Sequence, residues 1–258
     1  MNFQYGICSL AFIPIRTEPS HRAEMGSQLL FGEIYLIREI KGDWFLVENE
    51  YDHYTGWIAA NGVTFLNEEL YQKHKISSTL IQKSVWAEWQ TDNGRILTGI
   101  GTIIYFSSDN QYFNGKNTMS LVQGDLVSEG KLTLKESVEA GKSLLGSPYL
   151  WGGRSSMGID CSGLTQCLFR MAGISLPRDA WQQELRGVPV DFEQKKENDL
   201  AFFINEQGKV VHVGIVLNDN QILHASGKVR IDTIVPEGIV QYETGILTHK
   251  LKTVKSFQ

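Results

Sequence analysis

The chain has 258 residues, a formal net charge of −5 at neutral pH, and ordinary shares of hydrophobic (42%) and charged (21%) residues. Its length exceeds the common single-domain size, so we expect two or three compact units with hydrophobic cores of their own. The modest negative charge excludes the basic surface that nucleic-acid binding requires, and it argues against lasting attraction to anionic membranes.

The first unit is predicted over residues 1–63. Short β-rich runs alternate with turn residues there, at 9–15, 28–33, 34–40, 44–48 and 54–58. Many short strands at this spacing are typical of a small β-barrel.

The N-terminus leads to an expectation about location. The apolar run from Ile7 to Ile15 is interrupted by Ser9 and Pro14, and no basic residue precedes it. This pattern does not resemble a signal peptide, and no stretch of the chain is long and apolar enough to span a bilayer. We therefore expect a cytoplasmic protein, or a periplasmic or exported one if a leader peptide has been removed ahead of Met1.

A second unit is predicted over residues 64–131, with weaker signals. Strand-like runs lie at 84–89, 99–106 and 118–123, and Asn-Gly pairs at 93–94 and 114–115 mark turns. We expect a second, degenerate barrel here.

The third unit is predicted over residues 132–258 and begins with a helix. Thr133 and Glu136 have the spacing of a capping box, and Gly146 and Pro148 are stop signals. Four residues between them share one helical face and should be buried: Leu134, Val138, Gly141 and Leu145.

A cysteine stands at the start of the next predicted helix. The stretch 158–163 ends in Asp160-Cys161-Ser162-Gly163, and a buried stripe follows it: Leu164, Cys167, Leu168, Met171 and Ala172. In a first helical turn, the unpaired backbone N–H groups and the helix dipole favour thiolate over thiol. Cys161 is therefore a candidate nucleophile.

The other two cysteines have no such setting. Cys167 lies on the buried stripe and Cys8 in a strand pattern, so both are expected to be structural. Three cysteines cannot all pair within the chain, and their spacing matches no zinc motif. A reducing compartment is the simpler interpretation.

Two histidines follow on a predicted β-hairpin. The β-branched run 209–217, the turn 218–220 and the run 221–227 place His212 and His224 nearly opposite each other on one face. A thiol, a histidine that accepts its proton and a polar group that orients this histidine are the parts of a nucleophilic catalyst.

Three ordered motifs resemble the NlpC-type cysteine peptidases of bacterial cell-wall peptides. They are Tyr-x-Trp-Gly-Gly at 149–153, Asp-Cys-Ser-Gly at 160–163 and His-Val-Gly-Ile at 212–215. The resemblance implies a papain-like α+β catalytic domain. It also implies site residues: Cys161 as nucleophile, His212 as general base, His224 as orienting residue, Tyr149 at the oxyanion, and Asp160 and Ser162 in contact with substrate. Asn198 departs from the family, which usually has glycine there.

The first unit has a resemblance of its own. Gly-Glu at 32–33, Asp-Trp at 43–44 and Gly-Trp-Ile at 56–58 resemble the bacterial SH3-like domains that precede NlpC-type domains. No Gly/Ser-rich linker separates the units, so we expect the barrels to pack against the catalytic domain.

Within this group the chain looks most like the γ-D-glutamyl-L-diamino acid endopeptidases, the dipeptidyl-peptidase VI type. That resemblance implies hydrolysis of the γ-D-Glu–L-diamino acid bond in free murein peptides with an N-terminal L-Ala, during cell-wall peptide recycling. An acid and a tyrosine of the first barrel would hold the free amine, and the stretches 23–28 and 52–57 supply Glu24 and Tyr54 for these roles.

Other interpretations remain open from the sequence. The same Cys-His-His set serves an amidase or acyltransferase, and the barrels could belong to a non-catalytic protein that binds wall fragments. A zinc site made of the same three residues is a weaker alternative. We expect no cofactor, no metal and a monomer, and a local ion pair between Arg178 and Asp179. Which diamino acid follows the scissile bond stays undetermined.

Overall fold

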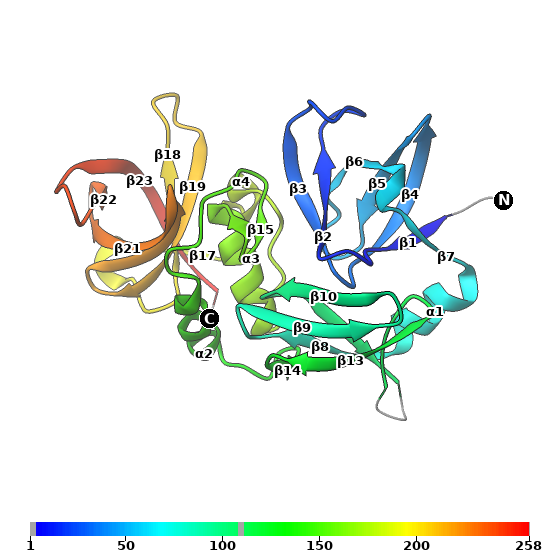
Figure 1. The fold of residues 1–258 in the computed structure, drawn as a ribbon. Helices are drawn as coiled ribbons and strands as arrows, with labels where there is room; N and C mark the ends of the chain where they lie inside the picture. The colour runs from blue at the N-terminus through cyan, green and yellow to red at the C-terminus, as the bar shows by residue number, and fades with distance from the viewer. Residues whose placement is uncertain (1–3, 108–110, 258) are drawn as a thin grey trace.

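The computed structural model describes residues 4–107 and 111–257. Figure 1 shows two small β domains, the first stacked on the second, and a third domain of helices and strands beside both. The prediction of an α+β chain with small barrels is confirmed. Residues 1–3, which belong to the N-terminal segment considered for a leader, lie outside the described part. Within that part, no helix has both the length and the hydropathy needed to cross a membrane.

The first domain is a seven-stranded antiparallel sheet in the order β3-β2-β6-β5-β4-β1-β7. Its core holds Leu29 together with Ile15, Val47 and Ile58, and the last three alternate with less buried residues along their strands. The five predicted strands are present with shifted ends, and β1 and β7 were not predicted. The elements are β1 (Tyr5–Ile7), β2 (Phe12–Arg16), β3 (Met25–Leu30), β4 (Ile34–Lys41), β5 (Trp44–Asn49), β6 (Thr55–Ala59), η1 (Ala60–Gly62) and β7 (Thr64–Leu66).

A short helix, α1 (Glu68–Ile76), joins the first domain to the second. Asn67 caps it by accepting a hydrogen bond from the Leu70 N–H at 2.9 Å, and Glu68 and Glu69 favour its first turn. This helix was not predicted, although Asn67 is a typical capping residue.

The second domain repeats the sheet order of the first, as β10-β9-β13-β12-β11-β8-β14. Trp89 and Ile104 are fully buried in its core. The expected runs at 84–89, 99–106 and 118–123 correspond to β9, β11 and β13. The elements are β8 (Ser78–Gln82), β9 (Trp86–Thr91), β10 (Gly94–Gly99), β11 (Ile103–Phe106), β12 (Tyr112–Asn114), β13 (Asn117–Gln123) and β14 (Leu126–Ser128).

The third domain packs helices against a closed antiparallel barrel. Its sheet runs β17-β23-β18-β19-β20-β21-β22, and the additional pairing of β22 with β23 closes it. The elements are α2 (Leu134–Gly141), η2 (Lys142–Leu144), β15 (Arg154–Ser155), β16 (Gly158–Ile159), α3 (Cys161–Met171), α4 (Ala180–Glu184), β17 (Val188–Val190), η3 (Phe192–Gln194), β18 (Leu200–Ile204), β19 (Val210–Asn218), β20 (Gln221–Ser226), β21 (Lys228–Val235), β22 (Gly238–Val240) and β23 (Leu247–Ser256).

Helix α2 begins with the predicted capping box between Thr133 and Glu136. Val138 and Gly141 are buried as expected, but Leu145 is 45% exposed. The expectation for Leu145 was wrong because the α-helix ends at Gly141 and a 3₁₀ turn follows, which rotates Leu145 off the helical face.

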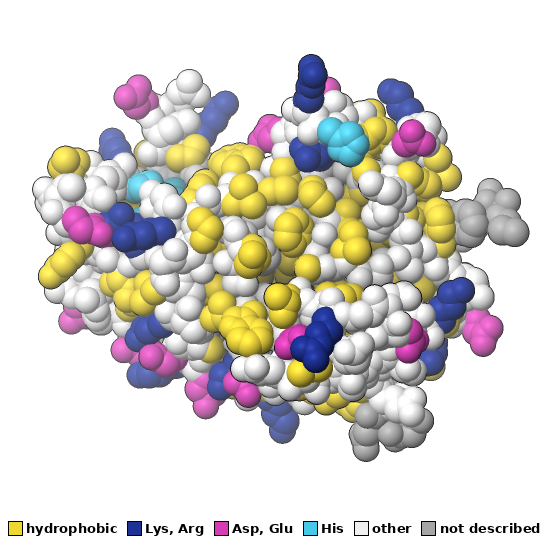
Figure 2. Space-filling model, viewed as in Figure 1, with side chains coloured by type: hydrophobic (Ala, Val, Ile, Leu, Met, Phe, Trp, Pro, Cys, Tyr) yellow, Lys and Arg dark blue, Asp and Glu magenta, His cyan; other side chains and the backbone are white. Residues whose placement is uncertain are grey.

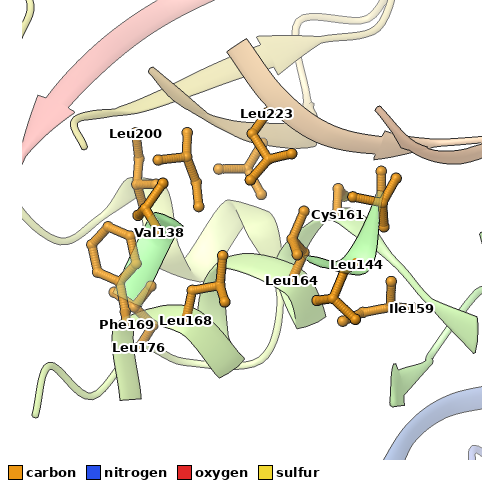
Figure 3. Close-up of a cluster of buried hydrophobic side chains, with 14 of the residues drawn as sticks. Val138, Leu144, Ile159, Cys161, Leu164, Leu168, Phe169, Leu176, Leu200 and Leu223 are labelled. Atoms are coloured by element: carbon orange, nitrogen blue, oxygen red, sulfur yellow. The ribbon is translucent and has the colours of Figure 1, made fainter. Parts of the chain in front are cut away.

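Helix α3 is buried on every side, not only along its predicted stripe. Figure 3 shows Leu164, Leu168 and Phe169 pointing from α3 into the core that it shares with the sheet. On the opposite side, Gln166 donates to Asp52 of the first domain at 3.0 Å. The helix that carries Cys161 is therefore held between the barrel of its own domain and the N-terminal domains.

A buried ion-pair cluster fixes the first domain to the third, as the absence of a flexible linker predicted. Glu33 accepts two hydrogen bonds from Arg154, at 2.8 and 2.9 Å, and one from Arg170 at 2.6 Å. All three side chains are at most 3% exposed. Burial raises the pKa of Glu33, but the two guanidinium groups outweigh it and hold the pKa at about 2.

Candidate active site

The backbone around Cys161 depends on two close approaches. Cys161 is the first residue of α3, and Asp160 caps the helix by accepting a hydrogen bond from the Gly163 N–H at 2.7 Å. A Cβ at Gly163 would lie 2.3 Å from the carbonyl oxygen of Gly153, and a Cβ at Gly152 would lie 2.3 Å from that of Met25. The glycines of both motifs therefore let the helix start sit against its own loop and against the first domain.

The Cys161 thiol is buried, and this corrects one expectation. The side chain is 5% exposed and hydrogen-bonds to the backbone of Val213, the residue after His212. Burial, together with the charge of Asp160, raises its pKa to about 12, although the Val213 and Ser162 backbone groups lower it. The helix start alone does not produce a thiolate here, because desolvation outweighs it. The resting group is a thiol that needs a base.

A chain of hydrogen bonds defines the state of that base. Nε2 of His212 lies 2.8 Å from Nδ1 of His224, and Nε2 of His224 lies 3.0 Å from Oδ2 of Asp232. A carboxylate only accepts, so His224 carries its proton on Nε2 and accepts at Nδ1. His212 must then donate from Nε2, which leaves the lone pair of its Nδ1 free to take a proton. The two histidines meet as predicted, but diagonally, because an irregularity near the turn places Gly214 rather than His212 opposite His224.

Asp232 was not predicted as part of the site. Burial raises the pKa of Asp232, but hydrogen bonds from His224, the Tyr242 N–H and Arg230 outweigh it and lower the pKa overall. The carboxylate stays ionised at neutral pH and fixes the tautomers of both histidines. It lies on β21, beside β20, and only the strand register brings it to His224.

A cleft opens above the thiol between the first and third domains. It has a volume of about 290 Å³, and six of the predicted site residues line it: Glu24, Tyr54, Tyr149, Asp160, Cys161 and Ser162. His212 and His224 are only 5% and 1% exposed and do not line the cleft, whereas Val210 and Val211 of the same strand as His212 do. Figure 2 shows hydrophobic side chains gathered in the middle of this face, between the domains.

Glu24 and Tyr54 reach the cleft from the first domain. Trp151 donates to Oε1 of Glu24 at 2.6 Å, so an exposed indole of the third domain holds the carboxylate in place. A Cβ at Gly26 would lie 2.1 Å from the Tyr54 hydroxyl, so the strand leaves room for that phenol. Both residues are therefore held at the domain boundary, where sequence analysis expected them.

The carboxylates of the cleft differ in their ion pairing. Arg178 binds Asp160 through two nitrogens, at 2.6 and 3.1 Å, and also donates to Ser162 and to Ser27 of the first domain. The expected local pair between Arg178 and Asp179 was wrong, because Arg178 turns inward to the helix cap. Among the described residues, Glu24 and Asp179 line the cleft without an ion-pair partner.

Asp179 and Trp181 are cleft residues that the sequence analysis did not identify. Burial raises the pKa of Asp179, and the charge of Arg178 opposes the shift. Trp181 is 52% exposed and adds an apolar wall. Asp179 had been expected only as a partner of Arg178, and Trp181 follows two residues later.

Tyr149 lies half-buried beside the thiol. Burial and the nearby Cys161 and Asp160 raise the pKa of its phenol, so it stays protonated and can donate a hydrogen bond. Within 4–107 and 111–257, no three His, Cys, Asp or Glu side chains converge in a way that could hold a metal ion.

Comparison with known proteins identifies two family matches. Residues 146–248 match the NlpC/P60 family, and residues 15–63 match the bacterial dipeptidyl-peptidase Sh3 domain. The gamma-D-glutamyl-L-lysine dipeptidyl-peptidase of Bacillus cereus is 28% identical over 247 residues, covering 83% of this chain and 71% of the relative. Dipeptidyl-peptidase 6 of Lysinibacillus sphaericus is 27% identical over 240 residues, covering 81% of this chain and 83% of the relative.

A solved structure shares the whole arrangement of domains. An NlpC/P60 family protein from Bacillus cereus superposes with a TM-score of 0.85 at 20% identity, covering 98% of this chain and 99% of that one. An NlpC/P60 endopeptidase from Photobacterium damselae subsp. piscicida has a TM-score of 0.73 at 16% identity, covering 97% and 70%. These likenesses establish the fold.

Proposed function

The chain is an enzyme with an NlpC/P60 cysteine peptidase domain and a bacterial dipeptidyl-peptidase SH3 domain, and we propose that it hydrolyses the γ-D-Glu–L-diamino acid bond of free murein peptides that begin with L-Ala. Such peptides arise in cell-wall peptide recycling. The names of the relatives in Bacillus cereus and Lysinibacillus sphaericus support a dipeptidyl-peptidase. The observation that carries the proposal is a single cleft lined both by Glu24 of the first domain and by Cys161 of the third.

In the first chemical step, Nδ1 of His212 takes the thiol proton of Cys161 while the sulfur attacks the γ-carbonyl carbon. Tyr149 donates a hydrogen bond to the oxyanion that forms. The C–N bond then breaks, and His212 returns the proton to the leaving amine of the diamino acid. A thioester remains on Cys161, and a water molecule activated by His212 hydrolyses it, which restores the thiol.

The Asp232–His224 pair assists both proton transfers. When His212 becomes an imidazolium, its Nε2–H still donates to His224 at 2.8 Å, and the Asp232 carboxylate lies at the far end of the chain. The positive charge is thus stabilised without a change of tautomer.

Selection of a free N-terminus follows from the charges of the cleft. A substrate ammonium that enters the cleft needs an anionic partner, because burying an unpaired charge is costly. Asp160 is already paired with Arg178, whereas Glu24 and Asp179 have no ion pair among the described residues. Burial raises the pKa of Asp179 and so disfavours its charged form, which leaves Glu24 as the better partner. We assign the ammonium to Glu24, with the Tyr54 hydroxyl as an additional acceptor.

The test uses L-Ala-γ-D-Glu-diaminopimelate and its N-acetylated form, with products identified by mass spectrometry. The free peptide should yield the dipeptide L-Ala-D-Glu, and acetylation should depress kcat/KM strongly. Glu24 is exposed in the free protein, so its hydrogen bond to the ammonium is buried only by the bound substrate. Losing one partner of a charged hydrogen bond buried in this way costs about 2–5 kcal/mol, so Glu24→Gln should lower kcat/KM for the free peptide by roughly thirtyfold or more. Glu39→Gln, an exposed acid of the same domain, is the matched control. Equal cleavage of both peptides by the wild type would refute the selection.

A further inference from the structure

A third histidine lies against the proposed base. His249, on β23, stacks on His212 with ring centroids 4.2 Å apart and an interplanar angle of 26°. None of the three sequence motifs contains His249. Its position depends on β23 pairing with both β18 and β22 in the closed barrel.

The His212 ring is contacted on three sides. His224 hydrogen-bonds to its Nε2 at 2.8 Å, and His249 covers one face. The ring centroid of Phe203 on β18 lies 5.8 Å from that of His212, with an angle of 47° between the ring planes. A single hydrogen bond at Nε2 leaves the imidazole some freedom to rotate about its Cβ–Cγ bond. The stacked ring removes this freedom, because rotation would drive His212 into His249.

We propose that His249 is a positioning residue for the base, whose ring holds the plane of His212 so that the Nδ1 lone pair keeps one direction while Nε2 donates to His224. The inference rests on the proposed role of His212 as base. In the proposed mechanism, His249 contacts neither the substrate nor the thiol, and it acts only through His212.

The protonation state of His249 suits this role. Burial, and then the neighbouring His224 ring, lower the pKa of His249 to about 4, although Asp232 opposes the shift. Its Nδ1 lies 2.8 Å from the Thr248 hydroxyl. The ring is therefore neutral near pH 7, and it can stack on an imidazolium at His212 without charge repulsion.

The pH dependence follows from the groups around both rings. Burial, then His224 and His249, hold the pKa of His212 well below its usual value. Among the described residues, the charged groups linked to these rings are on β21: Asp232 and Arg230, which is in turn paired with Glu243. Cys161 on α3 bonds to the backbone of Val213, the residue after His212. Removing the His249 ring lets water reach His212, so its pKa should rise toward that of a solvated imidazole.

The experiment compares His249→Ala with His249→Phe, which keeps a flat neutral ring. Because a displaced catalytic group loses rate rather than binding, His249→Ala should lower kcat about tenfold with KM changed less than about twofold. The acid limb of kcat/KM should move to higher pH by about half a unit or more. His249→Phe should recover most of kcat and the wild-type pH profile. His21→Ala, an exposed histidine of the first domain, is the control.

A second readout does not need a substrate. The rate of Cys161 alkylation by iodoacetamide, followed across pH, should shift in His249→Ala and not in His249→Phe, whether or not the tripeptide is cleaved. If wild type fails to cleave the peptide while this shift occurs, the proposed function fails and the positioning role stands. A His249→Ala variant with wild-type kcat and alkylation profile overturns the inference, and so does a His249→Phe variant as impaired as His249→Ala. If His249→Ala does not fold, His249→Gln replaces it with the same expectations.

Discussion

Replacing Asp232 by asparagine should disable the enzyme without removing any group that touches the substrate. Oδ1 of Asp232 accepts hydrogen bonds from the Tyr242 N–H at 2.9 Å and from Arg230 at 3.0 Å. Oδ2 accepts one from His224, and it also lies 2.7 Å from Nε of Arg230 in an ion pair without a hydrogen bond. In the amide, the oxygen will remain where the two donors to Oδ1 point. The NH₂ group then faces Nε2 of His224, where two donors cannot meet.

The clash between the amide N–H and the Nε2–H of His224 changes the tautomers of both histidines. His224 relieves it by moving its proton to Nδ1, which turns Nε2 into an acceptor. His212 must then accept at Nε2 and carry its own proton on Nδ1, so it can no longer take the thiol proton of Cys161. A base held in the wrong tautomer costs about 10⁴ in kcat, or roughly 5 kcal/mol of transition-state stabilisation.

The assay measures kcat and KM for the free tripeptide, with Asp219→Asn in the exposed β19–β20 turn as the matched control. Circular dichroism should show a folded Asp232→Asn protein, with KM changed little and kcat reduced by about three to four orders of magnitude. Activity above about a tenth of wild type in a folded variant would show that the Asp232 carboxylate does not set the tautomers.

Three further outcomes are expected. Cys161→Ala should abolish turnover in a folded protein, and iodoacetamide should label Cys161 well before Cys167, as peptide mapping will show; faster labelling of Cys167 would contradict the assignment. His212→Ala should remove almost all activity, whereas His224→Gln should keep part of it, because an amide oxygen can still accept from Nε2–H; a greater loss at position 224 would reverse the roles. Glu33→Gln should lower the free energy of unfolding by about 3–5 kcal/mol in denaturant titrations, because it leaves two buried guanidinium groups without a full partner. The pKa of Glu33 is depressed to about 2, so its stabilisation is present above the unfolded pKa of about 4.3 and is lost as pH falls through about 2; an unchanged acid midpoint in Glu33→Gln would argue against this.

The parts of the site that could be predicted are formed by residues close together in the sequence. Asp160 and Gly163 form a cap within one helical turn, and His212 and His224 flank one short hairpin, so spacing alone brings each pair together. The family resemblance supplied the other site residues, and six of the predicted residues line one cleft.

The parts that could not be predicted depend on long-range register and burial. Asp232 and His249 reach the histidines only because β21 and β23 take up particular registers in a closed barrel. Arg178 turned out to bind Asp160 because the whole α3 start is enclosed, which no local pattern indicates. The same enclosure raises the pKa of Cys161, against the expectation from its helix position.

The contact between Gly152 and Met25 has a consequence for how this chain can change over generations. A Cβ at Gly152 would lie 2.3 Å from a backbone oxygen of the neighbouring domain. A substitution on one of these two surfaces therefore requires a compensating change on the other. Domains joined by loose linkers can be exchanged freely, because few contacts cross the boundary. Here the loop that leads to the nucleophile packs closely against the backbone of the first barrel. A different barrel grafted in its place would have to reproduce that backbone, and the two domains should therefore be inherited together.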